Sequence, residues 1–195
     1  MLELCGTEPY TLADDVSPLT AKYAYVVMTR DDRQYSIAEK IPKFFPCETL
    51  NPVLIKRKWV DGEYKEVECP LLSGYIFLYS NEQMDSTVIH RLGDVQRVLQ
   101  YGDQVYALTG YGEQLARWLA RYNGVIGLSK AIQVGDRIQV VQGPMKDELC
   151  KIISVDKHKR RAKVEIQFNR AAFHVLMDFE WVENSGDKAA NISAS

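Results

Sequence analysis

The sequence predicts an α+β fold in two parts, an antiparallel sheet with helices followed by a small all-β barrel. Strand-like and helix-like runs are mixed up to about residue 123. Residues 134–168 hold three short runs in which apolar and polar residues alternate, which is typical of strands that bury one face. Turn residues separate these runs, at Gly143-Pro144 and at 156–160. Because an open sheet would expose its edges, we expect these strands to close into a barrel.

The first part is predicted to run strand, helix, three strands, helix, strand, helix. Tyr23 to Thr29 form a near-continuous apolar strand, and the acidic pair Asp31-Asp32 suits the start of a helix that Pro42 limits. Asp61-Gly62 lies between two strand-like runs and is a strong hairpin signal. The remaining predicted elements are a strand at 71–79, a helix from Asp85 or Ser86 to 92, a strand at 95–99 and a helix from Thr109 to Asn123-Gly124. This order is typical of an antiparallel sheet covered by helices.

Composition also indicates where the domains begin and end. Both ends of the chain are poor in large aliphatic residues, so we expect flexible tails there. The predicted organisation is a tail at 1–21, a first domain at 22–123, a linker at 124–130, a second domain at 131–183 and a tail at 184–195.

The overall composition argues against several classes of protein. The 195 residues carry a net charge of −2, so any contact with nucleic acid must come from a local patch. No apolar run approaches the roughly 18 residues of a membrane span, and no secretory signal is visible. The four cysteines form no CxxC pair, so we expect reduced thiols in a cytoplasm and no metal or cofactor. No catalytic arrangement or phosphate loop stands out, which makes an enzyme the least expected class.

The barrel segment resembles a KOW motif, which forms an SH3-like barrel at the end of NusG-type transcription factors. The matching residues are Val134-Gly135-Asp136, Gly143-Pro144, Val155-Asp156 and Arg161 to Val164. Asp147 and Cys150 stand where that family usually has glycines. Asp tolerates left-handed backbone, whereas Cys150 indicates a remodelled turn. Residues 156–162 are similar to the LoaP-type specialised paralogs of the family.

The first part resembles the same family. Pro70 to Phe77, PLLSGYIF, is similar to a strand of NusG N-terminal domains usually written P-L-F-P-G-Y-V/L-F, with Ser73 as a departure. The resemblance covers roughly residues 23–183, with both motifs in family order.

The resemblance implies two contacts with RNA polymerase. A hydrophobic cavity that docks on the clamp helices would be lined by Met28, Leu72, Tyr75 and Phe77. From the residues alone, an aromatic pair two apart in a strand is more often core. Asp85, Ser86 and Thr87 lie where RfaH-like members contact the gate loop, although the same residues also suit a helix N-cap.

Two basic clusters are candidate RNA-binding sites. Lys56, Arg57 and Lys58, followed by Trp59, could contact phosphates and stack a base, or could be a charged edge strand. The second cluster contains Lys157, Lys159, Arg160 and Arg161, which could contact RNA or the ribosome, or form a solvated turn. Gln167-Phe168 and Phe173 could instead supply an apolar protein-binding edge.

The resemblance therefore implies a monomeric elongation factor that binds RNA polymerase and suppresses pausing and termination in specific operons. The implied partners are RNA polymerase, an RNA hairpin or upstream DNA, and a ribosomal protein bound by the KOW domain; no membrane is implied. The alternatives are a general NusG-like elongation and termination factor, and a ribosome-associated RNA-binding protein.

Overall fold

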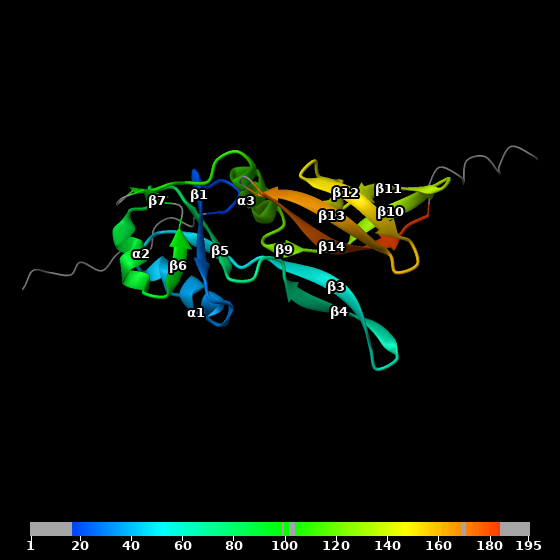
Figure 1. Cartoon of the computed structure of the whole chain (residues 1–195), viewed down its shortest axis with the longest axis horizontal. Coiled ribbons are helices and arrows are strands. Elements are labelled where there is room, and N and C mark those ends of the chain that lie inside the picture. Colours follow the sequence, from blue (N-terminus) through cyan, green and yellow to red (C-terminus); the bar gives the residue numbers. More distant parts are fainter. Residues whose placement is uncertain (1–16, 99, 102–103, 169–170, 184–195) are drawn as a thin grey trace, which may run out of the picture.

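The computed structural model describes residues 17–98, 100–101, 104–168 and 171–183, and shows a mixed α/β fold with a sheet at each end of the molecule (Figure 1). Most of both predicted tails lies outside the described residues. The described end of the first tail is packed, because Ala21 is buried and its amide donates to the Ser17 carbonyl.

The N-terminal half is built on a four-stranded antiparallel sheet of order β2-β5-β1-β6. Its strands are β1 (Tyr23–Thr29), β2 (Glu48–Leu50), β5 (Tyr75–Ser80) and β6 (Val95–Val98). Two longer helices accompany it, α2 (Ser86–Leu92) and α3 (Tyr111–Arg121). A small pair, β7 (Gln100–Tyr101) and β8 (Gln104–Val105), connects β6 to α3.

Three predicted elements of this half differ in the structure. The helix predicted after Asp31 is divided into η1 (Asp31–Arg33), α1 (Gln34–Ala38) and η2 (Ile41–Lys43). Helix α1 ends at Ala38 because the ring of Pro42 would clash with the Ala38 carbonyl in a continuous α-helix. The strand predicted at 71–79 begins only at Tyr75, after a turn at Gly74, whose φ is +78°. A Cβ at that position would lie 2.5 Å from the Thr29 carbonyl oxygen, so only glycine fits. Helix α3 is capped by Gly110 instead of Thr109.

The predicted hairpin is confirmed as β3 (Val53–Val60) and β4 (Glu63–Pro70), joined by Asp61 and Gly62 at φ +53° and +86°. This turn geometry suits the twist of paired strands. The hairpin forms its own sheet with β9 (Val125–Ile126), which runs parallel to the start of β3. The predicted linker at 124–130 therefore contains strand β9 and the start of the next strand.

The C-terminal half is a five-stranded sheet of order β11-β10-β14-β13-β12. Its strands are β10 (Ser129–Val134), β11 (Arg137–Gln142), β12 (Cys150–Asp156), β13 (Arg161–Phe168) and β14 (Ala171–Trp181), with the short helix η3 (Pro144–Lys146) between β11 and β12. Among the described strands, β11 and β12 are not paired with each other, so the closed SH3-like barrel stays a prediction.

Two hydrophobic clusters lie on opposite faces of the N-terminal sheet. On one face Ile76 and Leu78 of β5 pack with residues of α1 and α2. On the other face Phe77 and Tyr79 pack with α3, and this cluster continues into the C-terminal sheet through residues such as Val164. The two halves of the chain therefore share one core.

Candidate docking face and nucleic-acid surfaces

Alternation along β5 places the two predicted docking aromatics on the shared face. Tyr75 is half-buried and Phe77 is fully buried. The ring of Phe168, at the end of β13, lies 6.1 Å from the Tyr75 ring and 6.2 Å from the Phe77 ring, measured between centroids. Both aromatics thus point to one face, as their spacing predicts, and the C-terminal half covers that face.

The other two predicted docking residues border the same place. Met28 of β1 lies directly across from Tyr75 of β5 in the antiparallel register. Leu72, in the turn before β5, is half-buried and packs against the shared core. Leu72, Tyr75 and Phe77 thus occur together where β5 meets the C-terminal half, and Met28 lies beside Tyr75 on the neighbouring strand.

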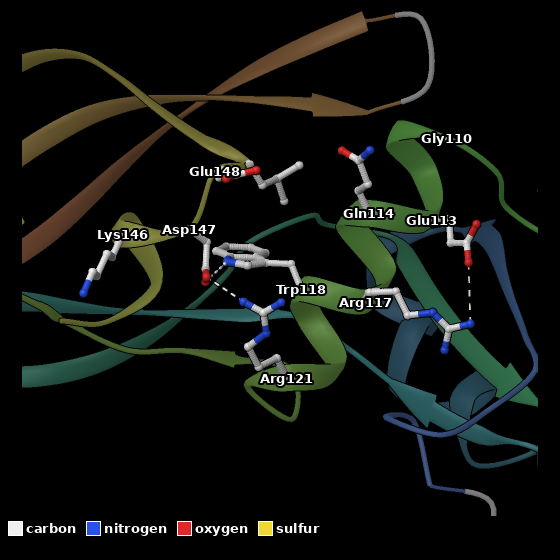
Figure 2. A pocket seen from close by; sticks show the side chains of 10 residues that line it. Gly110, Glu113, Gln114, Arg117, Trp118, Arg121, Lys146, Asp147 and Glu148 are labelled. Atoms are coloured by element: carbon white, nitrogen blue, oxygen red, sulfur yellow. Dashed lines mark hydrogen bonds and ion pairs between the residues drawn. The ribbon is translucent and has the colours of Figure 1, made fainter.

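Asp147 joins the two halves at helix α3 (Figure 2). Its carboxylate accepts hydrogen bonds from the Trp118 indole nitrogen at 3.1 Å and from the Tyr122 hydroxyl at 2.8 Å, and it pairs with Arg121. Burial is the main cause, and the hydrogen bond to Asp147 the second cause, that raises the pKa of Tyr122 to about 12. The Tyr122 hydroxyl therefore stays a donor at neutral pH. Trp118, Arg121 and Asp147 line a hollow of about 650 Å³ between α3 and the η3 turn.

Asp178 joins the two halves at the hairpin. Its side chain is 2% exposed, and its carboxylate accepts the Arg57 backbone N–H of β3 at 2.8 Å. The same carboxylate holds the Arg161 guanidinium through two hydrogen bonds. Charge-assisted bonds of this kind are the strong ones, so the middle of the hairpin is fixed to β14.

The predicted RNA-binding residues of the hairpin lie along β3. Lys58 and Trp59 are exposed, and Lys56 and Arg57 are half-buried. Among the described ion pairs none involves Lys56, Arg57 or Lys58. The hairpin as a whole is neutral, because four acids, Asp61, Glu63, Glu66 and Glu68, balance its four basic residues. Its positive charge is therefore concentrated on β3.

The second basic cluster is partly engaged inside the protein. Lys157 donates to the Asp136 carbonyl at 2.8 Å, and Lys159 pairs with Asp156 at 3.6 Å. Arg160 is exposed and has a positive φ of 52° in the turn. Arg161 is committed to Asp178, which gives it a role in holding the halves together.

The predicted gate-loop residues form the start of helix α2. Asp85 is the N-cap, and its carboxylate accepts the Thr87 N–H at 2.8 Å and also the Thr87 hydroxyl. These bonds hold the pKa of Asp85 below its usual value. Ser86 is buried, whereas Asp85 and Thr87 are exposed, so the tripeptide caps the helix and leaves two side chains accessible.

The structure adds no sign of metal or thiol chemistry in its described part. No group of His, Cys, Asp and Glu there could hold a metal ion. Burial raises the pKa of Cys47 and of Cys150 to about 12, so both thiols stay protonated at neutral pH. Within the same residues no helix has the length and apolar character needed to span a bilayer.

The roles of Asp147 and Asp178 were not predicted from the sequence. The sequence did mark Asp147 as unusual, because this residue stands where the KOW pattern usually has a glycine. Asp178 interrupts the apolar end of β14, between Met177 and Phe179, and an acid there indicates a buried partner.

Comparisons with known proteins agree with the C-terminal assignment. Residues 134–167 match the KOW motif, which spans β11, β12 and most of β13. The chain thus carries a KOW domain behind an α+β half.

Fourteen chains of solved structures are similar to this chain, among them a NusG of Thermotoga maritima, whose structure is described as "Domain interaction in Thermotoga maritima NusG". That match has 16% identity and a TM-score of 0.47, and covers 80% of this chain and 93% of the other. No curated protein matches the chain.

Proposed function

We propose that this chain is a NusG-type transcription elongation factor that binds RNA polymerase and acts as a processive antiterminator of specific operons, as LoaP-type paralogs do. The observation that carries the proposal is the joint placement of Met28, Leu72, Tyr75 and Phe77 on one face, next to a KOW domain at 134–167. Aromatics beside a flexible methionine suit the grip of an apolar helix tip.

Polymerase binding through this face requires the two halves to separate. Phe168 lies against Tyr75 and Phe77, and the bonds to Asp147 and Asp178 hold the cover in place. The covered chain would be in equilibrium with an open one, and polymerase would bind only the open form. The apparent affinity is then the affinity of the open form reduced by its population.

Once docked, the factor needs no chemistry to act. Contacts to the clamp helices and, through Asp85 and Thr87, to the gate loop would add binding energy only when the polymerase cleft is closed. The polymerase equilibrium would shift toward elongation. The exposed cations Lys58 and Arg160 would contact nucleic acid, and the released KOW domain would bind a second partner.

The test is binding of the purified chain to RNA polymerase. Tyr75→Ala should weaken binding by at least about 30-fold, which corresponds to about 2 kcal/mol for an aromatic anchor. We choose Tyr75 because Phe77 is fully buried and its truncation would also destabilise the fold. Tyr35→Ala is the matched control, since Tyr35 is 59% exposed on α1, which packs against the opposite face.

Normal binding by Tyr75→Ala would place the docking face elsewhere. Transcription through a terminator distinguishes the related proposals: readthrough should rise with an antiterminator and fall with a general termination-assisting factor. Co-sedimentation of the chain with ribosomal subunits, and not with polymerase, would favour the ribosome-associated RNA-binding protein.

A further inference from the structure

The tip of the β3–β4 hairpin carries an exposed aromatic pair. Trp59 and Tyr64 are 64% and 62% exposed, and no large apolar residue of the described chain is more exposed than Trp59. They lie directly opposite each other in the hairpin register, with ring centroids 4.8 Å apart in an edge-to-face arrangement. Removing such a pair from water would be favourable, so folding alone does not explain its exposure.

Charged groups surround this pair in an ordered way. Side chains two apart share a face of a strand, so Arg57 lies on the aromatic face, and its guanidinium sits 5.1 Å from the centre of the Tyr64 ring. Lys58 and Lys65 face each other across the two strands. These two lysines lie on the opposite face from the rings, and Lys65 is paired with Glu63 at 3.2 Å, so Arg57 is the cation beside the aromatic pair.

The position of the tip leaves it accessible. The base of β3 pairs with β9, and its middle is fixed to Asp178 through the Arg57 amide. Beyond that point the hairpin extends past the rest of the molecule (Figure 1). A rigid base and a free tip present the two rings as a preorganised surface.

We propose that Trp59 and Tyr64 form a stacking platform for an unpaired base of RNA, with Arg57, on the same face of the hairpin, contacting the adjoining phosphate. This inference rests on the RNA-binding role proposed above and adds the feature of the RNA that the hairpin recognises. Because the hairpin is neutral overall, phosphate attraction along β3 is weak by itself. Stacking on an aromatic ring supplies affinity that does not depend on net charge, and it selects an unpaired base over a stacked one within a duplex.

The experiment uses the full chain and two RNA probes, a hairpin with an unpaired loop and a blunt duplex of the same stem. The loop probe should bind more tightly and quench tryptophan emission, since Trp118 is 2% exposed and Trp181 is half-buried. Trp59→Leu keeps an apolar side chain but lacks a ring, and should lose about tenfold in affinity for the loop probe with the salt dependence unchanged. Arg57→Gln, which keeps the backbone N–H that Asp178 accepts, should lower the log–log salt slope by about 0.7 for the phosphate that the variant no longer neutralises.

Control variants separate the possible failures. Tyr111→Ala, which removes an aromatic that is 53% exposed on α3, should bind both probes as the parent does. If Trp59→Leu binds RNA normally while Arg57→Gln is weak, the RNA-binding role stands and the platform is wrong. If the parent binds neither probe, the RNA-binding role itself fails. Tighter binding of the same sequence as a DNA strand, or loss of polymerase binding alone in Trp59→Leu, would assign the rings to another occupant.

Discussion

The two faces of the N-terminal sheet are covered in different ways. The face of Ile76 and Leu78 is covered by α1 and α2, which follow soon after strands β1 and β5 of the same sheet. The face of Tyr75 and Phe77 is covered by α3 and by the C-terminal half, including Phe168. A local cover forms with the sheet, whereas a distant cover is held by contacts that can be exchanged for those of a partner. Burial alone therefore does not distinguish a permanent core from a covered binding face.

The largest expected effect compares these two faces directly. Leu78→Ala should lower the free energy of unfolding by about 2–5 kcal/mol and Phe77→Ala by about 3–5 kcal/mol, because each removes a side chain with no exposed surface. Urea unfolding of the full chain measures both. A loss below about 1 kcal/mol for Phe77→Ala alone would mean that the C-terminal half does not cover this face in solution.

The next effect concerns the buried carboxylate at the hairpin. Asp178→Asn should lower the free energy of unfolding by about 2–4 kcal/mol, because it leaves Arg161 without its ionic partner. The Arg161 side chain is 30% exposed, so water offsets part of this loss. The matched control is Lys151→Gln, which breaks an exposed ion pair with Glu165 and should cost at most about 1 kcal/mol.

A double-mutant cycle sharpens this comparison. Adding Arg161→Gln to Asp178→Asn should restore part of the stability, since neither charge is then unpaired. Additive losses would show that the two side chains act independently.

Asp147→Ala should have a smaller effect on stability and a visible effect on binding. It leaves the buried Trp118 indole N–H without an acceptor, at a cost of about 1–3 kcal/mol to the closed form. Because the open form gains population, apparent polymerase affinity should rise by about 5- to 150-fold when the closed form predominates. Lys146→Gln is the control in the same turn, since Lys146 is exposed and beside the hollow. Unchanged binding by Asp147→Ala would contradict the opening step.

The order of most elements could be predicted from the sequence, because short-range patterns determine them. Alternation predicts β13, and Asp61-Gly62 predicts the hairpin. The KOW assignment also came from local residues, at 134–168, and the family match at 134–167 agrees with it. Contacts between the halves could not be predicted, because nothing local indicates that Asp178 meets the Arg57 amide, 121 residues away. For the same reason strand β9, which lies within the predicted linker at 124–130, was not expected, since β9 forms only where β3 is available to pair with it.

The smallest effect concerns the permanently covered face, at the cap of α2. Asp85→Ala removes the acceptor of the Thr87 N–H and should lower the Tm slightly, whereas Asp85→Asn keeps an oxygen that caps a helix well. The pKa of Asp85 is depressed in the folded chain, so its contribution is present above the pKa of the unfolded chain and is lost as pH falls through the lower, folded pKa. The difference in Tm between parent and Asp85→Ala should therefore shrink in acid.

The pair of variants also separates the two roles of Asp85. Asp85→Asn should retain the Tm of the parent and, where the carboxylate contacts the polymerase gate loop, should weaken antitermination. Equal antitermination by parent and Asp85→Asn would leave Asp85 with the helix cap alone.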